Sequence, residues 1–131
     1  MQYTYRSALT REDVSKLIEA LESGDFKQCH GRFYTPAARR PNIEEMQEHC
    51  CLNVATIIFG LPFGPDAGCG SPELKQRFDF RDGGIHSLYG AMMFWNDKRK
   101  MSFAQIAANL RECQYGADGF AFYTADTPQQ P

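Results

Sequence analysis

The chain has 131 residues, of which 43% are hydrophobic, 13% aromatic and 23% charged. That length suits one domain with one core, and the composition excludes the charge-rich, apolar-poor class of disordered chains. The formal net charge of −2 excludes a general positive field that would attract nucleic acid polymers, so any bound anion is expected to be held locally.

The predicted fold class is α+β: a small antiparallel sheet with an N-terminal and a C-terminal amphipathic helix, in a single domain of residues 1–131. The N-terminal helix is predicted over residues 11–22. Thr10 and the acids that follow it form a start of the capping-box type, and Ser23-Gly24 ends the helix. Apolar residues recur inside it at helical spacing: Val14, Leu17, Ile18 and Leu21.

The middle of the chain is predicted to hold two strands and a short buried helix. Aromatic residues 33–34 favour the first strand. Residues 35–42 hold two prolines and two arginines and are predicted to form a loop, while residues 43–48 fit either a helical turn or a continuation of that loop. The apolar run 49–59 is predicted to be a strand through Leu52, antiparallel to the first strand, followed by the buried helix.

A hairpin is predicted after a long loop. Residues 60–72 contain four glycines and three prolines, which indicates a turn-rich segment without a helix or strand of its own. Aromatic residues alternate with charged ones over 78–82, which predicts a half-buried strand. Asp82-Gly83-Gly84 predicts a tight turn, and the return strand is expected over residues 85–89 or slightly later, over 92–95.

The C-terminal helix is predicted to begin after Ser102, whose side chain caps it while Gln105 reaches back to the cap. It is expected to end within residues 111–113. Its apolar stripe consists of Phe103, Ile106, Ala107 and Leu110. Residues 115–123 are predicted to add an edge strand, and residues 124–131 to form a frayed, flexible tail.

The targeting and cysteine patterns predict a cytoplasmic protein. The longest apolar run, residues 54–63, is about half the length needed to span a bilayer, so no membrane association is expected. The first six residues lack the apolar core of a secretory signal. An odd number of cysteines without a CxxC pair indicates neither a disulfide framework nor a zinc ribbon. Buried, inert thiols are expected at Cys29, Cys50, Cys51, Cys69 and Cys113.

The residue pattern contains no recognisable catalytic centre, so the chain is predicted not to be an enzyme and to need no metal and no cofactor. Cys29-His30 and His49-Cys50 are neighbours in the sequence, but adjacent side chains on a strand diverge. The glycines form neither a Walker loop nor a dinucleotide fingerprint, and no acidic pair has a setting that separates its pKa values. A Cys–His pair or a metal cluster assembled from separate segments stays open as an alternative.

A small set of residues suits a nucleotide-like anion. Arg32, on a predicted strand, offers a guanidinium for phosphate, and Asn96-Asp97, at a predicted turn, offers an amide and a carboxylate for a base edge or a ribose hydroxyl. Nearby rings offer a stacking face: Phe94, Trp95 and Phe103. The alternative interpretation is that Trp95 and Phe103 are core residues, Asn96-Asp97 shapes the turn, and Arg32 is solvated.

Three segments, in order, carry a resemblance to a known family. They are residues 17–33 (Leu-Ile-Glu-Ala-Leu-Glu-Ser-Gly-Asp-Phe-Lys-Gln, then His-Gly-Arg-Phe), residues 49–55 (His-Cys-Cys-Leu-Asn-Val-Ala), and Trp-Asn-Asp at 95–97 with Met-Ser-Phe-Ala-Gln-Ile-Ala at 101–107. Together they resemble the first-described Thoeris anti-defence sponge family of small phage proteins. The chain departs from that pattern at Asn53, where the family is expected to have glycine.

This resemblance implies a protein that binds and sequesters a cyclic ADP-ribose-type immune signal without cleaving it, in the cytoplasm of an infected bacterial host. It also implies a homodimer or a higher homo-oligomer with the pocket where protomers meet. By the resemblance, Arg32 and Arg111 face phosphate, and Asn96 with Asp97 holds base or ribose. Phe94, Trp95 or Phe103 stacks on a ring. Some relatives bind cyclic oligonucleotides at a separate basic site, for which Arg32 and Arg111 are the candidates.

Two other functions stay open at this point. One is a small interaction protein that inhibits a host enzyme by surface contact, with the aromatic residues as hot spots. The other is a small cysteine- or metal-dependent enzyme that uses His49 with Cys50 and Cys51. The sponge hypothesis depends on whether Arg32, the Asn96-Asp97 corner and an aromatic ring converge around one hollow, within a protomer or between protomers.

Overall fold

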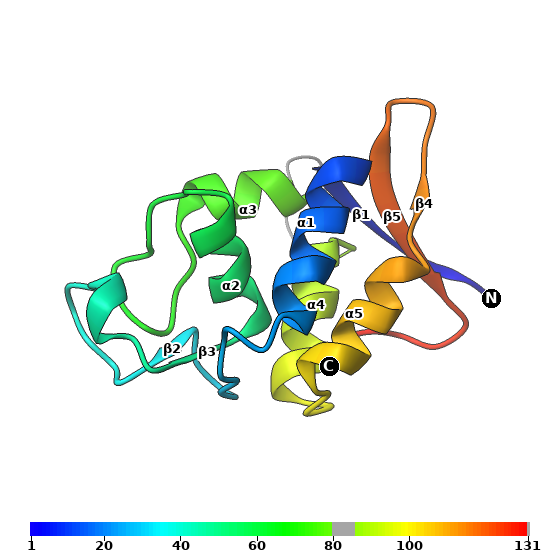
Figure 1. The fold of residues 1–131 in the computed structure, drawn as a ribbon. Coiled ribbons are helices and arrows are strands. Elements are labelled where there is room, and N and C mark those ends of the chain that lie inside the picture. The colour runs from blue at the N-terminus through cyan, green and yellow to red at the C-terminus, as the bar shows by residue number, and fades with distance from the viewer. Residues whose placement is uncertain (80–85, 131) are drawn as a thin grey trace.

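The computed structural model describes residues 1–79 and 86–130, and within them it has an α+β fold (Figure 1). Its helices surround one core, and its strands form two small antiparallel sheets. In chain order the elements are β1 (Tyr3–Thr10), α1 (Arg11–Glu22), β2 (Tyr34–Thr35), a 3-10 turn (Ile43–Glu45), β3 (Glu48–His49), α2 (Cys51–Ile58), α3 (Pro72–Asp79), α4 (Leu88–Asp97), α5 (Phe103–Arg111), β4 (Gln114–Tyr115) and β5 (Phe120–Ala125). None of the helices in the described ranges is long and apolar enough to cross a bilayer.

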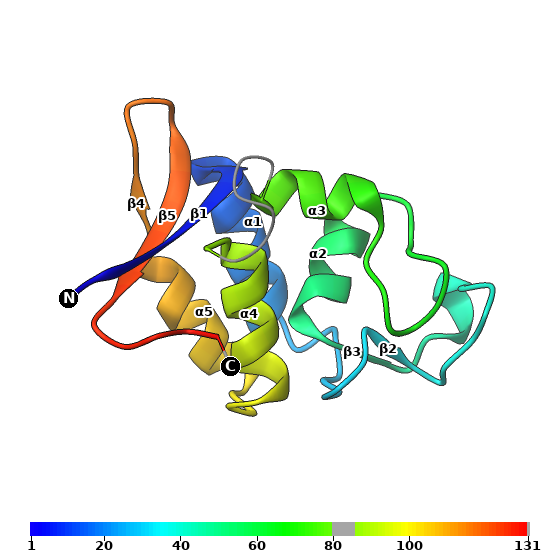
Figure 2. The ribbon, with the colours of Figure 1, turned by 180° about the vertical axis from the view of Figure 1, so that it is seen from behind.

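The main sheet has the strand order β1-β5-β4, with both pairings antiparallel, and Figure 2 shows β5 between the other two strands. The edge strand predicted within residues 115–123 is therefore the central strand, and the sequence interpretation missed β1. The missed signal was a period-2 pattern, because Tyr5, Ser7 and Leu9 are all buried on one face of β1. Tyr5 pairs with Tyr123 across the sheet.

Helix α1 has the bounds predicted from the sequence. Its capping box is complete: Asp13 N donates to Thr10 Oγ1 at 3.2 Å, and Thr10 N donates to Asp13 Oδ2 at 3.1 Å. The backbone amides of Thr10 and Asp13 thus both have hydrogen-bond partners within one turn, which fixes where the helix begins. The helix buries Val14, Leu17 and Leu21.

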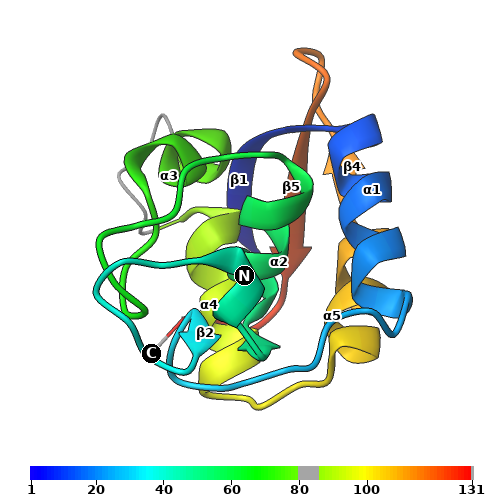
Figure 3. The same ribbon diagram turned by 60° about the vertical axis from the view of Figure 1, so that its left-hand side comes forward.

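Helix α5 begins with the second predicted capping box. Gln105 N donates to Ser102 Oγ at 3.1 Å, and Ser102 N donates to Gln105 Oε1 at 2.9 Å. The predicted stripe is buried: Phe103, Ile106, Ala107 and Leu110. Helices α1 and α5 pack against each other on one side of the molecule (Figure 3).

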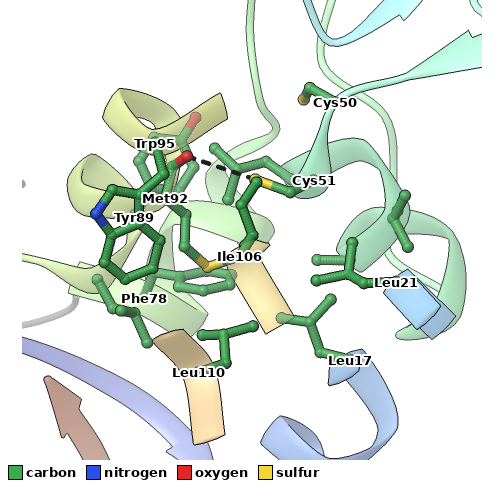
Figure 4. Close-up of a cluster of buried hydrophobic side chains, with 14 of the residues drawn as sticks. Leu17, Leu21, Cys50, Cys51, Phe78, Tyr89, Met92, Trp95, Ile106 and Leu110 are labelled. Atoms are coloured by element: carbon green, nitrogen blue, oxygen red, sulfur yellow. Dashed lines mark hydrogen bonds between the residues drawn. The ribbon is translucent and has the colours of Figure 1, made fainter. Parts of the chain in front are cut away.

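The core lies where these two helices meet the other three (Figure 4). Side chains from every helix converge there, including Leu17, Leu52, Leu74, Met92 and Ile106, each fully or almost fully buried. Burying one such side chain contributes roughly 1.5–3 kcal/mol. This packing holds together helices that are individually too short to be stable in water.

The hairpin predicted for residues 78–95 is wrong. Phe78 belongs to α3 and Tyr89 to α4, while the predicted turn at 82–84 and the start of its return strand lie outside the described residues. The helical spacing was present: Leu74 and Phe78 are four apart, and α4 buries Leu88, Ala91, Met92 and Trp95 along one face. A five-residue alternation is too short to distinguish strand from helix once both faces are partly covered.

The apolar run 49–59 also differs from its prediction. The strand is only Glu48–His49, paired with Tyr34–Thr35, and the helix α2 begins at Cys51 rather than after Leu52. Cys50 is the N-cap residue, with its thiol accepting from Asn53 N at 3.4 Å. The adjacent cysteines therefore lie at a helix start and not on opposite faces of a strand.

The C-terminal segment, predicted to be a flexible tail, lies against the domain. Thr124 and Ala125 are part of β5, and Gln129 is buried. Trp95 Nε1 donates to Gln129 Oε1 at 2.7 Å, and Gln129 N donates to the Tyr5 hydroxyl at 2.6 Å. The segment after β5 thus covers the indole edge of Trp95.

Candidate functional site

A buried polar network surrounds Asn96, at the C-terminal end of α4. The Asn96 side chain is 1% exposed. Its Nδ2 donates to Cys29 O at 2.9 Å and to Asp97 Oδ1 at 2.8 Å, and its Oδ1 accepts from Gln28 Nε2 at 2.9 Å and from Cys51 N at 3.2 Å. These bonds use the full donor and acceptor capacity of the amide, which leaves none for a ligand.

The same network pins the loop that follows α1. Gln28 Nε2 also donates to Met101 O at 2.7 Å, the His30 ring lies with Nδ1 2.5 Å from Asn96 O, and Gly31 N donates to Asp97 Oδ1 at 2.9 Å. Gly31 has a φ of +80°, which favours glycine. We call this set, Gln28 to Gly31 with Cys51, Asn96, Asp97 and Met101, the Asn96 knot.

The knot explains why the three motif segments occur together. Gln28 comes from the first segment, Cys51 from the second, and Asn96 with Met101 from the third, and all four meet through hydrogen bonds. The departure from the family pattern at Asn53 also has a local partner, because Asn53 Nδ2 lies 2.8 Å from His49 Nδ1. These motif residues therefore serve the fold directly.

An open hollow of about 380 Å³ adjoins the knot at Gly31. It is formed by residues 31–32 before β2, residues 37–39 after β2 and residues 66–68 before α3. The last two segments lie at the same end of the molecule (Figure 1). Two contacts hold the loops in place: Phe33 N donates to Ala67 O at 2.6 Å, and the Tyr34 hydroxyl donates to Ala38 O at 3.0 Å. We call this hollow the Arg32 groove, lined by Gly31, Arg32, Ala37, Ala38, Arg39, Asp66, Ala67 and Gly68.

The groove carries two exposed guanidinium groups, those of Arg32 and Arg39. Within residues 1–79 and 86–130, neither group has an ion-pair or hydrogen-bond partner. The one carboxylate in the lining is that of Asp66, whose Oδ1 accepts from Gly68 N at 2.8 Å. The lining therefore has an excess of one positive charge, although the whole chain has a net charge of −2. A free guanidinium fork matches phosphate and carboxylate groups.

The predicted stacking rings lie elsewhere. Trp95 is 1% exposed and packs its ring edge-on against Tyr123, with the centroids 5.0 Å apart. Phe103 is a buried residue of the α5 stripe, and Phe94 is half-buried against the core. The lining residues of the Arg32 groove include neither these three rings nor Asn96 and Asp97. Of the residues predicted to converge around one hollow, only Arg32 lines this groove.

Arg111 is not in the Arg32 groove either. Its guanidinium donates to both carboxylate oxygens of Glu22, and this hydrogen bonding lowers the pKa of Glu22 and raises the pKa of Arg111. Arg111 lines a smaller hollow of about 240 Å³ together with Arg11, whose guanidinium lies 4.0 Å above the ring of Tyr115. Both cations of that hollow already have partners, which distinguishes it from the Arg32 groove.

The prediction of five buried thiols is wrong for Cys69, which is exposed, and Cys113 is half-buried. The other three thiols and that of Cys113 are poorly suited to nucleophilic chemistry. Burial raises the pKa of Cys29 to about 11, with Glu48 and Asp97 adding to the effect, and burial raises the pKa of Cys113 to about 12. Burial also raises the pKa of Cys50 and Cys51. The thiolate is the reactive form, so these groups are protonated and unreactive near neutral pH. Within the part of the chain that the structure describes, no group of three or more His, Cys, Asp or Glu side chains is placed to hold a metal ion.

Sequence reasoning missed most of the groove. Arg39, with Arg40, is a basic pair that could hold an anion or be solvated loop charge, and the sequence does not single out Asp66. The available signal was that both segments are glycine- or proline-containing loops with charged residues, since binding residues are often carried on loops held by a rigid scaffold. Nothing in the sequence indicates that these loops meet.

Fold and groove together define the class: a small α+β domain with an open, locally basic surface groove. No protein-family model, no curated protein and no solved structure matches this chain. Its function is therefore argued from its own residues.

Proposed function

We propose that this protein is a non-catalytic sponge that sequesters a small phosphate-bearing signal of the cyclic ADP-ribose type in the Arg32 groove. The observation that carries the proposal is a pair of guanidinium groups in one hollow, those of Arg32 and Arg39, which have no partner among the described residues. The sequence resemblance narrows the ligand class to a cyclic nucleotide. The setting is then the cytoplasm of an infected bacterial host, where the phage protein removes an immune signal.

The size and charge of the groove support this ligand class. Ligand pockets are typically about 300–1,000 Å³, and the groove, at about 380 Å³, falls within that range. A hydrogen bond between a charged group and phosphate contributes roughly 1.5–3 kcal/mol. Because the groove is open, a second protomer that closes it would exclude water and strengthen these contacts. We therefore include in the proposal that the protein forms a homodimer or a higher homo-oligomer.

Sequestration without cleavage fits the side chains that line the groove. They are guanidinium, carboxylate and methyl groups, together with glycine backbone. Among these lining residues the Asp66 carboxylate is the one group of a kind that can act as a general base or nucleophile, and no thiol, hydroxyl or imidazole in the lining accompanies it. The ligand should therefore be recovered unchanged when the protein is denatured.

The test is a thermal-shift and calorimetric titration with cyclic ADP-ribose isomers. Ligand binding to the folded state alone raises the apparent stability, so binding should raise the melting temperature. Arg32→Ala and Arg39→Ala should each weaken binding by about tenfold or more, the equivalent of one charged hydrogen bond. The matched control is Arg40→Ala, an exposed neighbour outside the lining, which should retain affinity.

Two kinds of outcome would contradict the proposal. The first is failure of the binding test: either affinity falls equally in all three variants, or no isomer stabilises the unmodified chain. The second is release of ADP-ribose or another cleavage product, which would make the protein a hydrolase. The alternative of an interaction protein with aromatic hot spots gains no support from the geometry, because Trp95 and Phe103 are buried.

A further inference from the structure

Asp66 is the one acidic side chain in the lining of the Arg32 groove. Its Oδ1 closes a local turn by accepting from Gly68 N at 2.8 Å. Its Oδ2 has no ion-pair or hydrogen-bond partner among the described residues. The residue is exposed, so this oxygen is accessible to a ligand.

The backbone that carries this carboxylate is held beside the backbone of Arg32. Phe33 N donates to Ala67 O at 2.6 Å. Arg32 directly precedes Phe33 in the chain, and Asp66 directly precedes Ala67. The turn is held a second time by Cys69 N, which donates to Asp66 O at 3.3 Å. The carboxylate therefore remains in the groove with the guanidinium groups.

A fixed carboxylate works against a simple anion. Like charges repel, so a ligand that consists only of phosphate is attracted by the arginines but also meets the repulsion of Asp66. A ligand that also carries a hydroxyl or amino group donates a hydrogen bond to the same carboxylate and converts the penalty into a favourable contact. Asp66 can thus discriminate between two classes of phosphate ligand.

We propose that the groove selects ligands that combine phosphate with a hydrogen-bond donor, and that Asp66 is the residue that recognises the donor. The inference rests on the proposed anion-binding function of Arg32 and Arg39. Sugar hydroxyls and amino groups are the two donor chemistries that fit. Asp66 is then a specificity-determining residue, while the arginines supply affinity for phosphate.

Asp66→Asn isolates the charge. Asparagine retains an oxygen at the Oδ1 position, so the bond from Gly68 N is kept, and the bond from Cys69 N involves only the backbone. The turn should therefore persist, with a melting temperature close to that of the unmodified chain. Arg32→Ala is the companion variant, because it removes affinity for phosphate without touching the carboxylate.

The experiment is a calorimetric titration of the unmodified chain and both variants with three probes: inorganic pyrophosphate, cyclic ADP-ribose and phosphoethanolamine. Pyrophosphate lacks an added donor, cyclic ADP-ribose supplies sugar hydroxyls, and phosphoethanolamine supplies an ammonium group. We expect Asp66→Asn to bind pyrophosphate several-fold more tightly and at least one donor-bearing probe roughly tenfold more weakly, the equivalent of one charged hydrogen bond. Arg32→Ala should weaken all probes that bind.

The two proposals fail in different ways. If Asp66→Asn binds every probe as tightly as, or more tightly than, the unmodified chain, the role of Asp66 is overturned while the anion site stands. If Arg32→Ala binds the probes as well as the unmodified chain, or if no probe binds at all, the proposed anion site itself is overturned. Weaker binding of all probes to Asp66→Asn, pyrophosphate included, also contradicts the charge argument.

Discussion

The Asn96 knot and the Arg32 groove share Gly31 but use their polar groups in opposite ways. In the knot, the Asn96 amide has a partner at every position and is shielded from water. In the groove, the guanidinium groups of Arg32 and Arg39 are exposed and have no partner in the part of the chain that the structure describes. A buried polar group without a partner lowers the stability of the fold, whereas an exposed one is solvated by water. Of these two regions, therefore, only the groove has polar groups that are available to bind a ligand.

The comparison assigns different roles to residues that the sequence grouped together. Arg32 and Asn96-Asp97 were expected to face one ligand, yet Asn96 holds three segments of the chain together and Asp97 accepts from Gly31 N. The knot positions the groove, because Gly31 belongs to both. Changes in the knot should therefore affect stability, and changes in the groove should affect binding.

The largest effect is expected from Asn96→Ala. The variant leaves Cys51 N and Cys29 O without their buried partner, and Gln28 Nε2 keeps only its bond to Met101 O. Each unsatisfied buried group costs roughly 1–3 kcal/mol, so the free energy of unfolding should fall by about 3–5 kcal/mol. Urea denaturation measures this loss. Arg32→Ala, the matched groove variant, should change stability by less than ~0.5 kcal/mol, and a loss of similar size in both variants would remove the distinction between knot and groove.

A smaller effect is expected from Gln129→Ala. This change removes the partner of the Trp95 indole N–H and leaves that donor buried, at a cost of roughly 1–3 kcal/mol. Trp95 is the single tryptophan, so its fluorescence reports the site directly, and opening of the C-terminal segment should shift the emission to longer wavelength. The half-buried neighbour Gln130 provides the control, because Gln130→Ala should leave both stability and emission nearly unchanged. An unaltered spectrum in Gln129→Ala would show that the segment does not cover Trp95 in solution.

The smallest effect is expected from pH, through His49 beside the knot. Burial lowers the pKa of His49, and its Nδ1 lies 2.8 Å from Asn53 Nδ2, which favours the neutral ring as acceptor. The unfolded chain, with a histidine pKa of about 6.5, then binds a proton before the folded chain does. The contribution of His49 to stability is full above about pH 6.5 and is lost as the pH falls towards the folded pKa.

Urea denaturation at pH 7.5 and pH 5.5 measures this dependence. The unmodified chain should lose more stability between the two values than His49→Gln, whose side chain does not titrate, and the difference should be about 1 kcal/mol or less. Equal losses in both proteins would show that His49 does not carry the dependence. Groove binding by Arg32 is not expected to follow the same curve, since guanidinium stays charged throughout.

Much of the local structure was predictable from the sequence. The start of α1 and the start of α5 depend on Thr10 with Asp13 and on Ser102 with Gln105, and each pair lies three residues apart. The turn-rich segment before α3 was likewise predictable from its glycines and prolines. Such features are encoded within one turn of chain, where residue type alone fixes the hydrogen-bond partner.

Only the tertiary structure decided the rest. Residues predicted to form a hairpin belong instead to helices α3 and α4, whose apolar side chains are buried by contacts on several sides. A short alternation of aromatic and charged residues does not reveal such burial. The role of Asn96 depends on Cys29 and Cys51, 67 and 45 residues away in the chain. The groove likewise exists only because Phe33 N meets Ala67 O. By itself, then, the sequence determined where helices α1 and α5 begin and which residues they bury. Tertiary packing decided which polar side chains form hydrogen bonds within the protein and which remain available to a ligand. The reason is that packing, and not spacing along the sequence, brings together hydrogen-bond partners that are distant in the chain.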